Sequence, residues 1–144
     1  MRRILFVGAA VAALALAGSA SAYLTLARGD TNAAMRQFLA LPATCPSCYL
    51  DRLTLARLLV DRGRDQEAWP ILRGEHISKT LAPFPTTILW TLLRARVAER
   101  TGKRELAIQS YSWVAGMWRN ADPELQPYVT EAREGLARLT GERR

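Results

Sequence analysis

The feature that most constrains this chain is an uncharged, apolar segment near its start. From Ile4 to Ala27 no residue is charged, whereas Arg2 and Arg3 precede the run and Arg28 follows it. The run is longer than the roughly 20 apolar residues that a membrane-spanning helix needs. We therefore expect residues 1–28 to be a signal-anchor or a signal peptide.

Two interpretations of this segment remain open. Its basic start, apolar centre and small residues Ala20-Ser21-Ala22 are typical of a secretory signal that is cleaved after Ala22. The apolar run continues to Ala27, which favours a retained anchor. The positive-inside rule keeps the first arginines in the cytoplasm. We predict a single-pass inner-membrane protein that contacts the membrane through residues 4–27 and places its C-terminal domain in the periplasm. The alternative is secretion to the periplasm after cleavage at Ala22.

Composition narrows the classes of function. The chain carries 20 Lys and Arg against 13 Asp and Glu, a formal charge of +7. A basic domain raises the question of nucleic acid, but export and the interspersed acids favour a solvated surface of mixed charge, so no nucleic-acid partner is expected. One His and two Cys leave little material for a metal site or a histidine-dependent centre. We predict no catalytic residue, no metal site and no cofactor.

The part after the apolar segment is predicted to be all-α. No stretch alternates apolar and polar residues as a half-buried strand does, and Gly63, Gly102 and Gly141 stand where helices typically end. Asp122-Pro123 is typical of a helix start. The predicted helices cover residues 31–41, 49–62, 65–72, 87–100, 104–118 and 123–139.

Apolar residues at helical spacing predict the core. The predicted core positions, in chain order, are Tyr49, Leu53, Ala56, Val60, Ile88, Leu92, Ala95, Ala107, Tyr111, Val114 and Trp118. The last predicted helix carries the apolar residues Leu136 and Leu139.

An internal repeat joins two of the predicted turns. Gly63 precedes Ala68 by five positions, and Gly102 precedes Ala107 by the same spacing, 39 positions later. A small residue stands seven positions before each glycine (Ala56 and Ala95), and a large one four positions after each alanine (Leu72 and Tyr111). Glycine allows a tight turn, and the small residues let the two helices approach closely.

This pattern resembles the tetratricopeptide repeat, whose period is about 34 residues. The resemblance implies a linker or short helix at 29–44 and a short helical-hairpin solenoid at 45–144, with about two repeats and a capping helix. Pro70 departs from the family pattern, because it falls inside a predicted helix and should kink it. In the family, the first helix of each repeat lines a binding groove. This places the expected protein-binding residues at Leu50, Leu53, Arg57, Leu89, Leu92, Arg96 and Arg100.

Trp113 is a second candidate contact, either as an exposed interface anchor or packed beneath the final helix. The resemblance and the anchor together predict a non-catalytic accessory subunit that stabilises a larger membrane complex, for example of photosynthetic or respiratory kind. A transient assembly factor is an alternative.

Cys45 and Cys48 form a CxxC pair. Haem attachment would need His where Tyr49 stands, and the βαβ frame of a thioredoxin-type centre is missing. A local structural disulfide in an oxidising compartment is the preferred interpretation. Free thiols and a periplasmic thiol/disulfide redox protein remain alternatives. His76 is expected to be a solvated loop residue.

Overall fold

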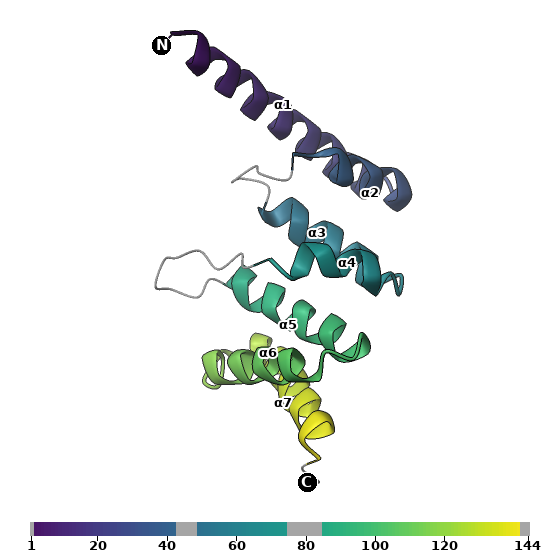
Figure 1. Cartoon of the computed structure of the whole chain (residues 1–144), viewed down its shortest axis with the longest axis vertical. Coiled ribbons are helices and arrows are strands. Elements are labelled where there is room, and N and C mark those ends of the chain that lie inside the picture. The colour runs from purple at the N-terminus through teal and green to yellow at the C-terminus, as the bar shows by residue number, and fades with distance from the viewer. Residues whose placement is uncertain (1, 43–48, 75–84, 142–144) are drawn as a thin grey trace. The chain divides into compact units, whose positions relative to one another are not determined.

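The computed structural model describes residues 2–42, 49–74 and 85–141, with side chains in the first helix described from residue 14 onward. All regular structure in these ranges is helical, which confirms the all-α prediction (Figure 1). The elements are α1 (Arg2–Ala27), α2 (Thr31–Ala40), α3 (Tyr49–Val60), α4 (Asp65–Leu72), α5 (Pro85–Arg100), α6 (Arg104–Met117), a 3-10 turn η2 (Pro123–Leu125) and α7 (Gln126–Thr140). Cys45, Cys48 and His76 lie outside the described residues.

The chain divides into two compact units, Met1–Leu58 and Leu59–Arg144. We call them unit 1 and unit 2 and describe each by itself. The boundaries expected from the sequence, after residues 28 and 44, do not coincide with this division.

Three turns of the chain share one backbone geometry. Gly29, Gly63 and Gly102 all have positive φ, of 87°, 68° and 75°. In each case the following residue donates its N–H to a carbonyl five positions back: Asp30 to Thr25 at 3.2 Å, Arg64 to Leu59 at 2.9 Å, and Lys103 to Ala98 at 2.8 Å. This is the Schellman pattern that ends a helix at a left-handed glycine. The turn at Gly29 lies 34 positions before the turn at Gly63.

The same side-chain pattern surrounds each of these turns. The alanines seven positions before the glycine and five positions after it have no exposed surface; they are Ala22, Ala34, Ala56, Ala68, Ala95 and Ala107. The large residues four positions further on, Phe38, Leu72 and Tyr111, are equally buried. The α1–α2 segment thus repeats the pattern that the sequence shows at Gly63 and Gly102, and α1 contains the run that predicts a signal-anchor or a signal peptide.

In unit 1, the C-terminal half of α1 packs on α2 and bonds to α3. The Ser19 hydroxyl donates to Oδ1 of Asp51 at 2.8 Å, and Asp51 is only 5% exposed. The Tyr23 ring meets Phe38 edge-on at 5.0 Å between centroids, and its hydroxyl is 3.1 Å from Oγ1 of Thr54. One side of α1 between residues 14 and 27, which includes Ala15 and Ala22, is therefore part of the folded core of unit 1.

In unit 2, α5, α6 and α7 share one core. The predicted stripes on α5 (Ile88, Leu92, Ala95) and on α6 (Ala107, Tyr111, Val114, Trp118) are all buried, as expected. Helix α5 is buried beyond its predicted stripe, since Trp90, Leu93, Val97 and Ala98 are buried too.

The predicted core face on α3 needs a partial correction. On α3 the buried apolar residues are Leu55, Ala56, Leu59 and Val60, while Tyr49 and Leu53 are only half-buried. Ala56 and Val60 are thus buried as predicted, but Tyr49 and Leu53 are not. Helix α3 is leucine-rich around its circumference, so spacing alone does not identify the whole buried face. On α7 the buried residues are Val129, Ala132 and Gly135, and Leu136 and Leu139 lie at the edge of the core.

The capping of the predicted helix start at Asp122 differs from expectation, whereas Pro70 lies inside a helix as predicted. Asp122 makes no side-chain cap; its backbone carbonyl accepts the N–H of Leu125 at 2.9 Å, closing the η2 turn before α7 begins. Pro70 lies inside α4, which continues for two residues beyond it. The N–H of Arg73 then closes the helix on the carbonyl of Trp69 at 2.9 Å.

Candidate interaction surfaces

The predicted groove residues on α5 are largely engaged within unit 2. Leu92 is 2% exposed and belongs to the core, so it has no surface to offer a partner. Leu89 is half-buried and packs against the same core. These two leucines stabilise unit 2, which corrects the expectation that Leu92 lines a groove.

Arg96 and Arg100 bind carboxylates of their own chain. The guanidinium of Arg96 forms a two-pronged ion pair with Glu131 of α7. The hydrogen bonds that Arg96 donates to Glu131 raise the pKa of Arg96, against the opposing effect of burial. Arg100 donates through Nε and Nη2 to Asp65 of α4, both at 2.7 Å. These arginines hold α5 to its neighbours, so reversing their charge would disturb the fold before it reported on a partner.

A second ion-pair network joins α5, α6 and α7. Glu99 accepts from Nε of Arg138 at 3.0 Å and from the Tyr111 hydroxyl at 2.7 Å. The bond from Arg138 holds the pKa of Glu99 below its usual value, and the Tyr111 bond acts in the same direction. Burial and the bond to Glu99 raise the pKa of Tyr111. Sequence analysis missed this network, because partners 12 and 39 positions apart leave no local signal.

The predicted contacts on α3 belong to unit 1. Leu50 is 54% exposed, Leu53 is half-buried and Arg57 is exposed. Leu50 is therefore the predicted groove residue that offers the most apolar surface.

Trp113 on α6 is half-buried and packs against the core of unit 2. This agrees with the alternative that Trp113 is packed inside the domain and is not an exposed interface anchor.

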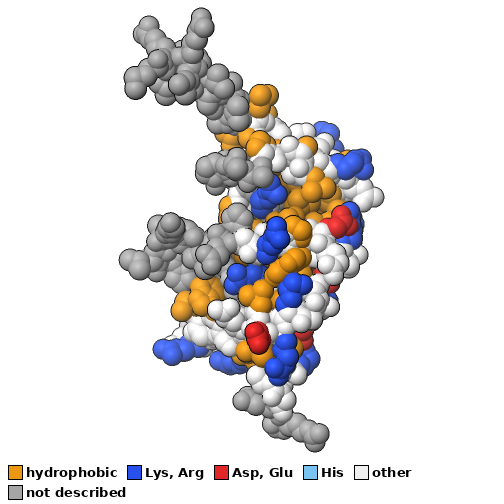
Figure 2. All heavy atoms as spheres, in the orientation of Figure 1, with side chains coloured by type: hydrophobic (Ala, Val, Ile, Leu, Met, Phe, Trp, Pro, Cys, Tyr) orange, Lys and Arg blue, Asp and Glu red, His pale blue; other side chains and the backbone are white. Residues whose placement is uncertain are grey.

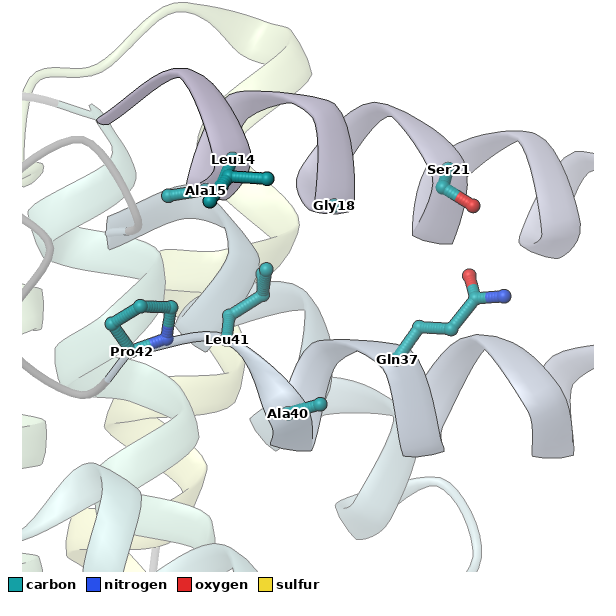
Figure 3. Close-up of a pocket in the computed structure, with 8 residues that line it drawn as sticks. All are labelled: Leu14, Ala15, Gly18, Ser21, Gln37, Ala40, Leu41 and Pro42. Carbon is teal, nitrogen blue, oxygen red and sulfur yellow. The ribbon is translucent and has the colours of Figure 1, made fainter. Parts of the chain in front are cut away.

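A groove that the sequence did not reveal lies between α1 and α2. Its volume is about 460 Å³, and its lining residues are Leu14, Ala15, Gly18, Ser21, Gln37, Ala40, Leu41 and Pro42. Figure 3 shows Leu41 pointing toward Gly18, and Ser21 and Gln37 facing one another across the groove. A Cβ at position 18 would lie 2.9 Å from Cδ2 of Leu41, so glycine permits this close approach. The matching spacing of Gly29 and Ala34 is the signal that could have predicted this hairpin.

Exposed apolar side chains gather in unit 1. The large hydrophobic residues with the most exposed surface in the described chain are Leu14, Leu16, Tyr23, Leu24, Leu39, Leu50 and Met117. All except Met117 belong to unit 1. Figure 2 shows hydrophobic side chains at the surface beside Lys and Arg on one face of the described chain. An exposed apolar surface that is large and contiguous typically marks a protein or membrane contact.

Within the described residues no group of three His, Cys, Asp or Glu could hold a metal ion. In the same part of the chain, no helix is long and apolar enough to span a bilayer. Family models, curated proteins and solved structures gave no match to this chain.

Proposed function

We propose that this protein is a non-catalytic interaction module of the tetratricopeptide-repeat type, held at a membrane by its N-terminal helix and acting as an accessory subunit of a larger membrane complex. The carrying observation is the threefold recurrence of one helix–glycine–helix pattern, at Gly29, Gly63 and Gly102, with fully buried alanines at matching positions.

Three repeats support the proposal better than two. Each helical hairpin of a solenoid buries only part of its apolar surface alone, and about three are needed for stability. With α1 and α2 counted as the first hairpin, the chain reaches that number. Helix α7 then serves as the cap, because its outward residues include Arg133, Glu134 and Arg138.

The exported side of the membrane remains our proposed location. Two arginines before an uncharged run direct the following chain out of the cytoplasm. Its partners would then be subunits of an envelope complex. They would bind to the concave surface that repeat proteins use for binding.

The exposed side chain of Leu50 provides the test. Leu50→Glu places a charge at the predicted groove, and Met117→Glu is a matched control because Met117 is exposed to a similar extent, 49% against 54%. Full-length tagged chains would be purified from native membranes in mild detergent, and the co-purifying proteins quantified by mass spectrometry. Thermal unfolding of each variant confirms that the fold is unchanged.

We expect Leu50→Glu to lower recovery of the partner about fivefold or more, because burying a leucine contributes about 1.5–3 kcal/mol and the substitution also places a charge in the interface. Met117→Glu should leave the recovery unchanged. Equal recovery with both variants would contradict the groove assignment. Failure of the wild-type chain to retain any membrane protein would contradict the proposed function.

A further inference from the structure

The outward face of α1 is uncharged along its whole described length. Between residues 14 and 27, the exposed positions are Leu14, Leu16, Ala17, Ala20, Ser21, Tyr23, Leu24 and Ala27. At 100° per residue these positions cover about half of the helix circumference. The other half, which includes Ser19 and Ala22, packs in unit 1. A helix that is buried on one side is thus apolar on the other side as well.

The exposed faces of other helices in this chain are different. Helix α6 exposes Arg104 and Glu105, and α7 exposes Arg133, Glu134 and Arg138. These are the polar outward faces expected of helices in contact with water. The composition of α1 is therefore specific to that helix.

Length points to lipid as the medium that covers this face. Residues 14–27 are held by side-chain bonds to α3, notably from Ser19 to Asp51. The uncharged residues before them, 4–13, rise only about 15 Å at 1.5 Å per residue. This is about half of the roughly 30 Å hydrocarbon core. Attachment to a bilayer while unit 1 is folded consequently needs the outward face of residues 14–27 as well.

Charge in unit 1 complements an anionic lipid surface. Between residues 14 and 58 the chain has the arginines Arg28, Arg36, Arg52 and Arg57 against two aspartates. Both aspartates accept internal hydrogen bonds: Asp30 caps α2 through the N–H of Ala33, and Asp51 binds Ser19. The sequence of unit 1 therefore carries a net positive charge, which favours binding to an anionic membrane.

We infer that the outward face of α1 between Leu14 and Ala27 is a lipid-docking surface, which seats unit 1 directly against an anionic bilayer. The inference rests on the proposed membrane attachment and adds its geometry. Under this inference the first hairpin lies at the membrane surface. Between Leu14 and Ala27, α1 contacts lipid on one side and the folded core of unit 1 on the other.

Flotation with lipid vesicles tests this surface. Full-length protein would be mixed with vesicles of phosphatidylglycerol and phosphatidylcholine, or of phosphatidylcholine alone, and floated through a density gradient. The variants are Leu16→Glu and Leu24→Glu on the outward face, with Met117→Glu in unit 2 as the control. All three side chains are about half exposed or more, so the substitutions leave the core intact, which urea unfolding of each variant verifies.

We expect the wild-type chain and Met117→Glu to float with the anionic vesicles and to bind phosphatidylcholine more weakly. Each leucine substitution should reduce vesicle binding about tenfold or more, because a buried leucine contributes that much to transfer from water. The inference is overturned if the wild-type chain stays unbound, or if Leu16→Glu and Leu24→Glu float as well as wild type. If the chain co-purifies with protein partners but does not bind vesicles, the proposed function is retained. The outward face of α1 would then be a protein interface. If the wild-type chain floats with vesicles but retains no protein partner, the lipid-docking surface is supported and the proposed subunit function is contradicted.

Discussion

Replacement of Gly135 by alanine tests how closely α6 and α7 pack. A Cβ at position 135 would lie 2.5, 2.6 and 2.8 Å from the ring carbons Cε2, Cζ and Cδ2 of Tyr111. Carbon atoms in favourable contact are about 3.5–4.0 Å apart, so the overlap is about 1 Å. The ring has little freedom to move, since it is 1% exposed and its hydroxyl is bonded to Glu99 at 2.7 Å. The two helices must therefore separate.

The expected cost combines two opposing effects. Overpacking of a core costs about 1–3 kcal/mol, while alanine favours a helix over glycine by about 1 kcal/mol. The overlap of about 1 Å with an immobile ring puts the overpacking cost at the upper end of its range. We therefore expect Gly135→Ala to lower the free energy of unfolding by about 2 kcal/mol, and to lower the melting temperature by about 4–8 °C for each kcal/mol in a unit of this size. Gly116→Ala is the matched control: Gly116 also lies in a helix, but a Cβ there meets no atom within 4 Å. It should be neutral or stabilise by up to about 1 kcal/mol.

Urea unfolding followed by circular dichroism measures both variants, and a double-mutant cycle with Tyr111→Leu tests the cause. If the ring causes the clash, Gly135→Ala should cost much less in the Tyr111→Leu background. The reasoning would be refuted if Gly135→Ala were as stable as wild type, or if its cost were unchanged when the ring is removed.

Three further predictions concern single contacts. Ser19→Ala leaves the buried carboxylate of Asp51 without that donor and should cost about 1–3 kcal/mol in urea unfolding; an unchanged midpoint would contradict the packing of α1 in unit 1. Glu99 has a folded pKa below its usual value because Arg138 donates to it, so its stabilisation is present above the unfolded pKa and is lost as pH falls below it. Glu99→Gln should accordingly flatten the loss of stability between about pH 5 and pH 3, and an equally steep loss would count against the pair. Gly102→Ala forces alanine to φ 75° and should lower stability by about 1–2 kcal/mol, whereas a neutral result would show that the turn relaxes.

Much of the helical layout could be predicted from local signals. Glycine and proline placed most helix ends within a few residues, and the stripe on α6 was identified correctly because one face of that helix is clearly apolar. The predicted stripe on α3 is right only at Ala56 and Val60, since leucines around the circumference of the helix give no preferred face.

The first hairpin escaped prediction for a physical reason. A helix that is apolar on both faces gives the same sequence pattern as a membrane span, so the composition of residues 14–27 masked their packing on α2 and α3. Ion pairs such as Arg96 with Glu131 depend on the register between helices that are distant in sequence, and no spacing rule contains that register.

Residues 14–22 are a permanent part of the first hairpin. The sharpest test is the mass of the mature chain isolated from native membranes. Ala22 has no exposed surface and Ser19 binds the buried Asp51. Because these contacts form the hairpin, we expect the mature chain to retain this segment. Intact mass measurement should find Leu14–Ala22 present. A mature chain that begins at Tyr23 would show that residues 14–22 are not needed for the fold, because α1 would then lack the residues that form the hairpin.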